Sequence, residues 1–135
     1  MICRFAILAA PLAVAACAPI DAETEVDPAL AGPAVEVVGE GRSCLNLAQI
    51  RNSRVRSDQV IDFEMRGGDV YRSVLPTRCP RLGFERAFTY DTSLTQLCRQ
   101  DIIYTLEQIG GSVRRGAGCG LGEFVPVEYV EDEGE

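Results

Sequence analysis

The chain has 135 residues and a formal net charge of −7, with 20 acidic residues against 13 basic ones, all of them arginine. It contains six cysteines but no histidine, lysine or tryptophan. The lack of histidine excludes imidazole bases and mixed Cys–His metal sites, and no nucleic-acid recognition motif is present, so we expect no metal, no cofactor and no nucleic-acid partner.

Residues 1–16 have the pattern of a secretory signal peptide. Arg4 precedes an apolar run, Phe5–Ala16, that is shorter than the about 20 residues needed to span a bilayer. The run ends in Val14-Ala15-Ala16-Cys17, which looks like a bacterial lipobox. In that case Cys17 receives lipid and becomes the new N-terminus, anchoring the protein to a membrane.

Cleavage after Ala15 is the alternative, and it would leave a soluble periplasmic protein. If the lipobox is used, Ala18 takes the place of the aspartate that retains lipoproteins in the inner membrane under enteric-type sorting. We therefore expect an exported, periplasm-facing protein, anchored in the outer membrane rather than the inner one.

Acidic segments flank the predicted domain on both sides. Residues 17–41 contain three prolines, three glycines and six acids without apolar periodicity, which predicts a flexible linker after the lipidated cysteine. Residues 128–135 predict an acidic C-terminal tail, and the folded domain is expected at 42–127. Residues 41–125 hold twelve arginines against nine acids, so the domain surface should be mildly basic.

The domain sequence favours short strands, because apolar residues alternate and turn residues separate the runs. In Val60–Met65, Ile61, Phe63 and Met65 share one face, and the turn residues at 66–69 predict a hairpin over 60–75. Further strands are expected at Leu45–Leu47, Phe84–Tyr90, Asp101–Glu107 with Ile102, Tyr104 and Leu106 facing inward, and Gly122–Val127.

A short helical turn is predicted over Leu94–Cys98. Together these elements predict a mainly β fold: a small, disulfide-stapled antiparallel β-barrel or roll of about five to six strands, after the signal peptide and the flexible linker.

Four cysteines remain in the domain, and in an oxidising compartment an even set predicts two disulfides. Cysteine spacing gives no Cys-x-x-Cys pair, which argues against a zinc or thioredoxin-type site. Of the three possible pairings we favour Cys79 with Cys98 and Cys44 with Cys119. A redox role remains a weaker possibility, which would require one readily reduced bridge.

Four short motifs lie at or between these cysteines, in this order along the chain: Val60-Ile61-Asp62-Phe63, Arg78-Cys79-Pro80-x-Leu82-Gly83-Phe84, Leu97-Cys98-x-x-Asp101 and Cys119-Gly120-Leu121-Gly122-x-Phe124-x-Pro126. Their order resembles a family of small exported proteobacterial proteins, classed as a domain of unknown function, over about residues 44–127. The resemblance implies export and disulfides, and it implies no activity or catalytic residue.

Three groups of residues are candidates for a site. Asp62 and Asp101 are the carboxylate pair that a small envelope hydrolase would need, although Asp62 is expected on the solvent face of a strand or paired with arginine, and Asp101 as a turn cap. Gly116–Gly122 lacks the lysine of a phosphate loop and is expected to be a turn that lets Cys119 reach its partner. An anion-binding surface is the third candidate, with Arg51, Arg54, Arg56, Arg66, Arg72, Arg78, Arg81 and Arg86.

The sequence therefore favours a non-catalytic binding or structural module of the bacterial envelope, anchored through lipid on Cys17. Its binding residues are unknown at this stage, and its partner is expected to be an envelope protein, a lipid or a glycan. The alternative is a small envelope hydrolase that uses the carboxylate pair Asp62 and Asp101.

Overall fold

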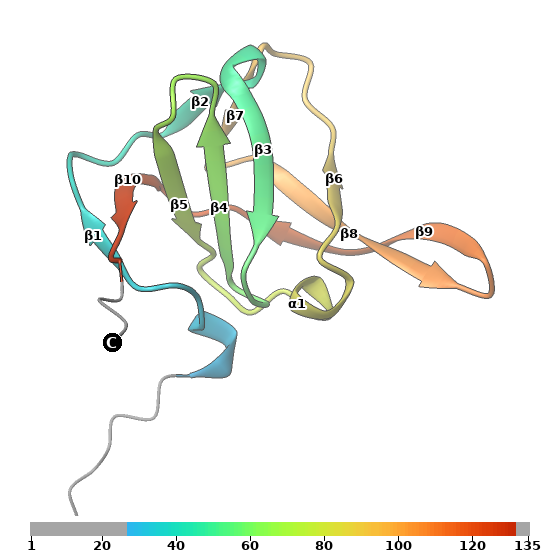
Figure 1. Cartoon of the computed structure of the whole chain (residues 1–135). Helices are drawn as coiled ribbons and strands as arrows, with labels where there is room; N and C mark the ends of the chain where they lie inside the picture. Colours follow the sequence, from blue (N-terminus) through green and yellow to red (C-terminus); the bar gives the residue numbers. More distant parts are fainter. Residues whose placement is uncertain (1–26, 132–135) are drawn as a thin grey trace, which may run out of the picture.

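A computed structural model describes residues 27–131 and confirms the mainly β, antiparallel class. Ten strands are present in this part of the chain, more than predicted, and they form three sheets without closing into a barrel (Figure 1). The strands are β1 Val35–Val37, β2 Cys44–Asn46, β3 Ile50–Val55, β4 Val60–Met65, β5 Val70–Val74, β6 Phe88–Tyr90, β7 Gln96–Cys98, β8 Ile102–Ile109, β9 Ser112–Gly120 and β10 Phe124–Tyr129.

The largest sheet has five strands in the order β1-β10-β5-β4-β3, so β3 forms one of its edges. At its centre lies the predicted hairpin, in which β4 and β5 pair from Val60–Val74 to Glu64–Val70. Gly68 in the connecting turn has φ +97°, a conformation that glycine adopts without steric cost. The alternating pattern and the turn chemistry of this segment thus correctly predicted the hairpin.

The other two sheets are β6-β8-β9 and the short pair β2-β7. The helical turn predicted over Leu94–Cys98 is wrong, because Gln96–Cys98 pairs as a strand with Cys44–Asn46. The strand predicted over Phe84–Tyr90 is shorter than expected. Its first residues belong to the helix α1 (Leu82–Glu85), and only Phe88–Tyr90 is extended.

Strand β8 buries the face opposite to the predicted one. Ile103 and Thr105 are fully buried, whereas Ile102 is exposed. Apolar residues occupy both faces of this strand, so alternation alone allows two orientations. Pairing with β6 and β9 selects the face that turns Ile103 toward the core.

The core lies between the five-stranded sheet and the β6-β8-β9 sheet. The Phe63 ring of β4 is fully buried, and it meets the rings of Phe88 and Phe124 edge-on at centroid distances of 6.4 and 5.4 Å. Aromatic pairs in this geometry contribute about 1 kcal/mol each beyond their burial. The two sheets are thus held together by packing across this cluster.

Two disulfides form, as predicted, but the favoured pairing is wrong. Cys44 is bonded to Cys98 and Cys79 to Cys119. The register of β2 with β7 places Cys44 directly opposite Cys98, with their Cα atoms 4.0 Å apart. Chain entropy favours the three pairings almost equally, so the strand register decides between them.

The fold begins before residue 42, where the linker was expected to end. Pro28–Leu30 forms the 3-10 turn η1, which buries Ala29, and β1 pairs with β10 at the edge of the large sheet. Strand β10 runs to Tyr129 and so includes the start of the predicted acidic tail. The signal peptide and Cys17 lie outside the described residues.

We predict that peptide mapping without reduction recovers the pairs Cys44–Cys98 and Cys79–Cys119. Replacing Cys79 and Cys119 together by alanine removes a cross-link that spans 40 residues. Denaturant unfolding should then show a loss of about 4 kcal/mol in the free energy of unfolding. A peptide that links Cys79 to Cys98 would contradict the structure.

Candidate binding groove

The carboxylate of Asp62 is fully buried and accepts four hydrogen bonds. Arg72, its direct neighbour on β5, donates from Nε at 2.7 Å and from Nη2 at 3.0 Å. Arg56 donates from Nε at 2.9 Å, and the Tyr129 hydroxyl donates at 3.0 Å. The prediction that Asp62 pairs with arginine is confirmed.

The prediction that Asp62 faces solvent is wrong, because the N-terminal segment covers this face of the sheet. The carbonyl of Ala29 accepts a hydrogen bond from the Ser57 hydroxyl, and the carbonyl of Pro33 accepts one from Arg72 Nη1 at 3.0 Å. These contacts hold the segment next to the arginines that bind Asp62. Figure 1 shows its path from η1 to β1. Sequence reasoning missed the burial because this segment was expected to be flexible.

Burial alone would raise the pKa of Asp62, but the hydrogen bonds from Arg72 and Arg56 outweigh it and hold the pKa below its ordinary value. A general acid needs a raised pKa and an open path to substrate. Asp62 has neither, because its oxygens are occupied by donors of the protein itself. The arrangement fits a structural charge cluster.

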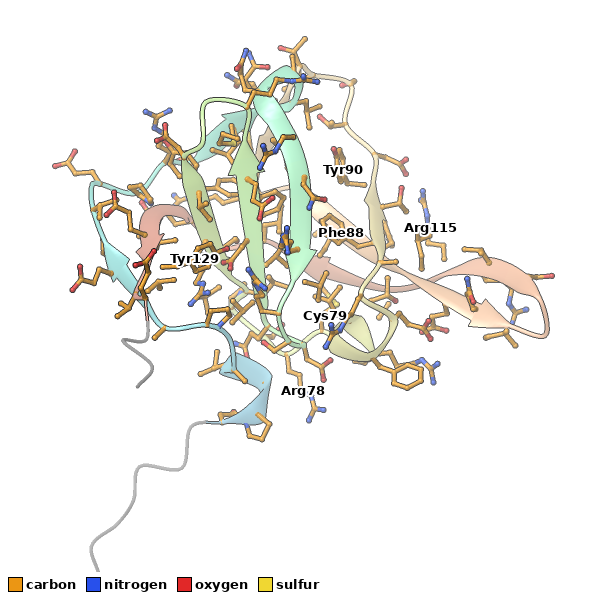
Figure 2. The ribbon with its side chains drawn as sticks, in the orientation of Figure 1. Arg78, Cys79, Phe88, Tyr90, Arg115 and Tyr129 are labelled. Carbon is orange, nitrogen blue, oxygen red and sulfur yellow. A yellow bond between two sulfur atoms is a disulfide. The ribbon has the colours of Figure 1, made fainter. Side chains whose placement is uncertain are left out.

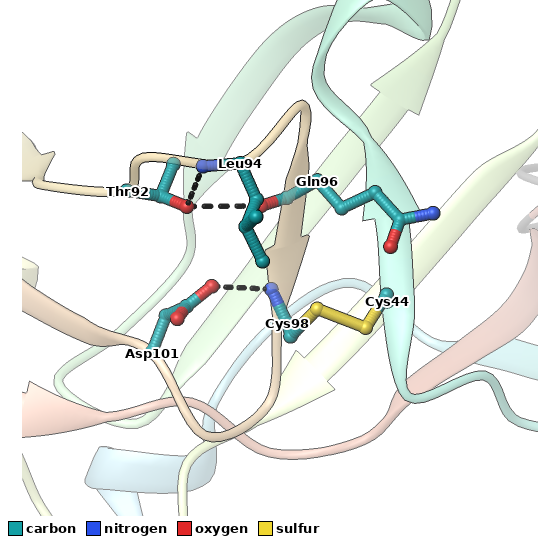
Figure 3. The surroundings of a disulfide bond; sticks show 6 residues. All are labelled: Cys44, Thr92, Leu94, Gln96, Cys98 and Asp101. Carbon is teal, nitrogen blue, oxygen red and sulfur yellow. Dashed lines mark hydrogen bonds between the residues drawn. A yellow bond between two sulfur atoms is a disulfide. The ribbon is translucent and has the colours of Figure 1, made fainter.

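Asp101 caps a turn, as predicted. Its Oδ2 accepts a hydrogen bond from the Cys98 backbone N–H at 2.7 Å, next to the Cys44–Cys98 disulfide (Figure 3). Asp62 and Asp101 share no hydrogen-bond donor, and they lie in different sheets or turns of the fold. The structure therefore does not bring them together as the carboxylate pair that the hydrolase alternative needs.

The turn predicted over Gly116–Gly122 is wrong for most of the segment, because β9 extends to Gly120. Gly122 follows it at a close backbone approach, where a Cβ would clash with the Val74 carbonyl oxygen. The N–H and carbonyl of Gly122 both bond to the Ser73 hydroxyl at 3.0 Å. These groups are satisfied within the protein and do not form an anion cradle.

The predicted arginine surface is divided among separate ion pairs. Arg54 binds Glu64 at 2.6 Å, Arg78 binds Asp58 at 2.7 Å, and Arg56 and Arg72 share Asp62. Within residues 27–131, five arginines form no ion pair: Arg42, Arg66, Arg86, Arg99 and Arg114. An anion-binding surface can draw on these side chains.

A groove of about 380 Å³ runs between β3 and β6, and we call it the β3–β6 groove. Figure 2 shows Phe88 and Tyr90 following each other along β6, on its side toward β3. Eight residues line the groove, among them two arginines and no acid: Ile50, Arg51, Asn52, Ser53, Arg86, Ala87, Phe88 and Tyr90. Three apolar members, Ile50, Phe88 and Tyr90, pack against the core and are only partly buried.

Both walls of the groove are open strand edges. β3 is an edge of the five-stranded sheet, β6 is an edge of the three-stranded sheet, and no backbone hydrogen bond joins them in the described chain. In an antiparallel pair, alternate residues direct their backbone groups away from the partner strand. The register of β3 with β4, and the backbone hydrogen bond from Arg56 to Val60 beside it, direct the N–H and carbonyl of Ser53 away from β4. In the same way, the register of β6 with β8 and the bond from Leu106 to Ala87 direct the backbone groups of Phe88 and Tyr90 away from β8.

Two further surface hollows, of about 430 and 490 Å³, are less suited to a ligand. In the first, Arg56 and Arg78 are already held by Asp62 and Asp58. In the second, Arg42 stacks on the ring of Tyr71 at 5.3 Å. The β3–β6 groove differs from both because strand edges form its walls.

Comparisons of the chain with family models, curated proteins and solved structures found no match. The resemblance to a family of exported proteins therefore stays a prediction. Within the described residues, no helix is long and apolar enough to cross a membrane. In the same part of the chain, no cluster of three or more cysteine, aspartate or glutamate side chains is arranged to hold a metal ion.

Replacing Asp62 with Asn should destabilise the fold. The variant keeps the side-chain shape but leaves two partly buried guanidinium groups without the carboxylate they share. We therefore expect the free energy of unfolding to fall by about 3 kcal/mol at neutral pH. Urea unfolding measures this loss. Glu64→Gln is the control, because Arg51 and Arg54 beside it are 63% and 53% exposed, and it should cost less than about 1 kcal/mol.

The same variant should also change the pH dependence. Because the folded pKa of Asp62 is lowered, its stabilisation is present above the unfolded value of about 4 and is lost as pH falls through the folded pKa. The gap between wild type and Asp62→Asn should therefore shrink in acid. Glu85 and Asp91, whose pKa values are lowered by Arg81 and Arg115, are common to both proteins. A constant gap down to about pH 2 would contradict this role of Asp62.

Proposed function

We propose that the protein is a membrane-anchored lipoprotein of the bacterial envelope and acts as a non-catalytic binding module. Its binding surface is the β3–β6 groove. The observation that carries this proposal is the pair of open strand edges that face each other across a floor of partly buried aromatic side chains. Such edges are sites for pairing with another chain unless they are blocked.

The charges of the domain support binding over catalysis. Arginines of the large sheet and its connecting loops form ion pairs with the carboxylates of Asp58, Asp62 and Glu64. In contrast, Arg86 in the groove makes no ion pair within residues 27–131. The free charge near the aromatic floor is therefore positive and available to a ligand.

The proposed anchor keeps the domain close to the membrane. The first described element, η1, begins at Pro28, so ten residues lie between it and Cys17. A fully extended stretch of ten residues reaches at most about 35 Å. A lipid on Cys17 would therefore hold the groove within reach of other envelope proteins and of periplasmic loops near the same membrane.

Photocrosslinking in intact cells tests the proposal. Benzoylphenylalanine replaces Asn52, an exposed residue of the groove, or Ser112, the exposed first residue of β9 at the far end of the β8–β9 hairpin (Figure 1). Irradiation should give a discrete adduct with a single envelope component from position 52 and none from position 112. Equal or diffuse labelling from both positions would contradict a binding groove.

Membrane fractionation of the same cells tests the anchor. The parent protein should sediment with membranes and carry lipid on Cys17, whereas Cys17→Ser should remain a precursor or appear in the soluble fraction. A parent protein that is soluble and begins after Ala15 would contradict the lipid anchor. It would not bear on the binding groove, which the crosslinking experiment tests separately.

A further inference from the structure

We infer that the occupant of the β3–β6 groove is an extended acidic peptide segment of another envelope protein, which adds as a β-strand between β3 and β6. This inference rests on the proposed function, since it names the class of partner that the groove binds.

The backbone groups on the open edges of β3 and β6 are able to pair with a peptide strand. The N–H and carbonyl groups of Ser53 on one side, and of Phe88 and Tyr90 on the other, point toward the groove. An extended peptide offers donors and acceptors on both of its edges with the matching repeat, so it can pair with either wall or with both. Lipid or glycan groups lack this repeat.

The side chains of a bound strand alternate between two environments. One set would face the groove floor, where Ile50, Phe88 and Tyr90 are partly buried and the rings of Phe88 and Tyr90 lie 6.3 Å apart. Apolar side chains at every second position would cover this floor. The other set would face outward, toward the charged side chains of the groove.

The charge of the lining selects acidic residues for the outward set. Arg51 and Arg86 line the groove, and no aspartate or glutamate does. Arg86 has no ion pair in the described chain, and Arg51 lies 3.6 Å from Glu64, which has a closer partner in Arg54 at 2.6 Å. Both guanidinium groups can therefore meet a carboxylate, whereas a basic segment would be repelled.

The direct test measures binding of a synthetic peptide to the processed, disulfide-bonded protein by fluorescence polarisation. The probe is a labelled peptide of alternating valine and glutamate, about six residues long, which is the usual length of a strand. We expect saturable binding. A peptide with lysine in place of glutamate, or with methyl groups on alternate backbone nitrogens, should bind about tenfold more weakly or not at all.

Matched variants locate the site. Arg51→Ala with Arg86→Ala should weaken binding of the acidic peptide about tenfold, while Arg99→Ala with Arg114→Ala removes the same charge elsewhere and should leave binding unchanged. Unchanged urea unfolding midpoints would show that both double variants fold. Amide NMR signals of Ser53, Phe88 and Tyr90 should shift on binding.

Several outcomes would overturn the inference. They are equal binding of the lysine peptide, tolerance of the backbone methyl groups, equal effects of the two double variants, and preference for anionic phosphatidylglycerol vesicles over the peptide. A crosslink from position 52 without peptide binding would leave the groove as the binding surface and reject only the extended acidic segment. Peptide binding without a crosslink in cells would instead count against the proposed function.

Discussion

No backbone hydrogen bond joins β3 to β6, the neighbouring edges of the two sheets that enclose the core, and the proposed binding surface depends on this open seam. What holds the sheets in place is packing of Phe63 against Phe88 together with the Cys79–Cys119 disulfide, which ties the segment after β5 to β9. A small domain that closed every edge would have no comparable site for pairing. The covalent bridges allow the fold to keep an edge open and remain stable.

On the face of the large sheet away from the core, the charged side chains pair with one another. Asp62 is fully buried and accepts hydrogen bonds from the partly buried Arg56, Arg72 and Tyr129, and the segment around Ala29 and Pro33 covers this cluster. Removing one partner from such a cluster is costly, because the remaining charge stays buried. We therefore assign the charges of this face to stability, and the proposed ligand contacts to the arginines at the seam.

The parts of the fold that were predictable from the sequence are those fixed by local chemistry. The β4–β5 hairpin follows from alternation around Phe63 and a turn that contains Gly68, and the Asp101 cap follows from its position three residues after Cys98. The number of disulfides follows from an even set of cysteines. The hairpin and the cap depend on residues that are close in the sequence, and the number of disulfides depends on the cysteine count alone.

Features that depend on pairing between strands far apart in the sequence could not be predicted from local patterns. The disulfide partners follow from the register of β2 with β7, and the inward face of β8 follows from its neighbours. The polar run of β3 from Arg51 to Arg54 has no apolar alternation, so sequence reasoning did not list a strand there and missed one wall of the groove. The hairpin turn between β3 and β4 was the signal that could have revealed it.

Hydrogen exchange of individual backbone amides tests most directly whether the seam between β3 and β6 is open. We expect the amides of Ser53, Phe88 and Tyr90 to exchange at least about tenfold faster than those of Arg54 and Thr89, which point toward β4 and β8. Protection of Ser53, Phe88 and Tyr90 equal to that of Arg54 and Thr89 would mean that the two edges pair with each other in solution, and it would contradict the account.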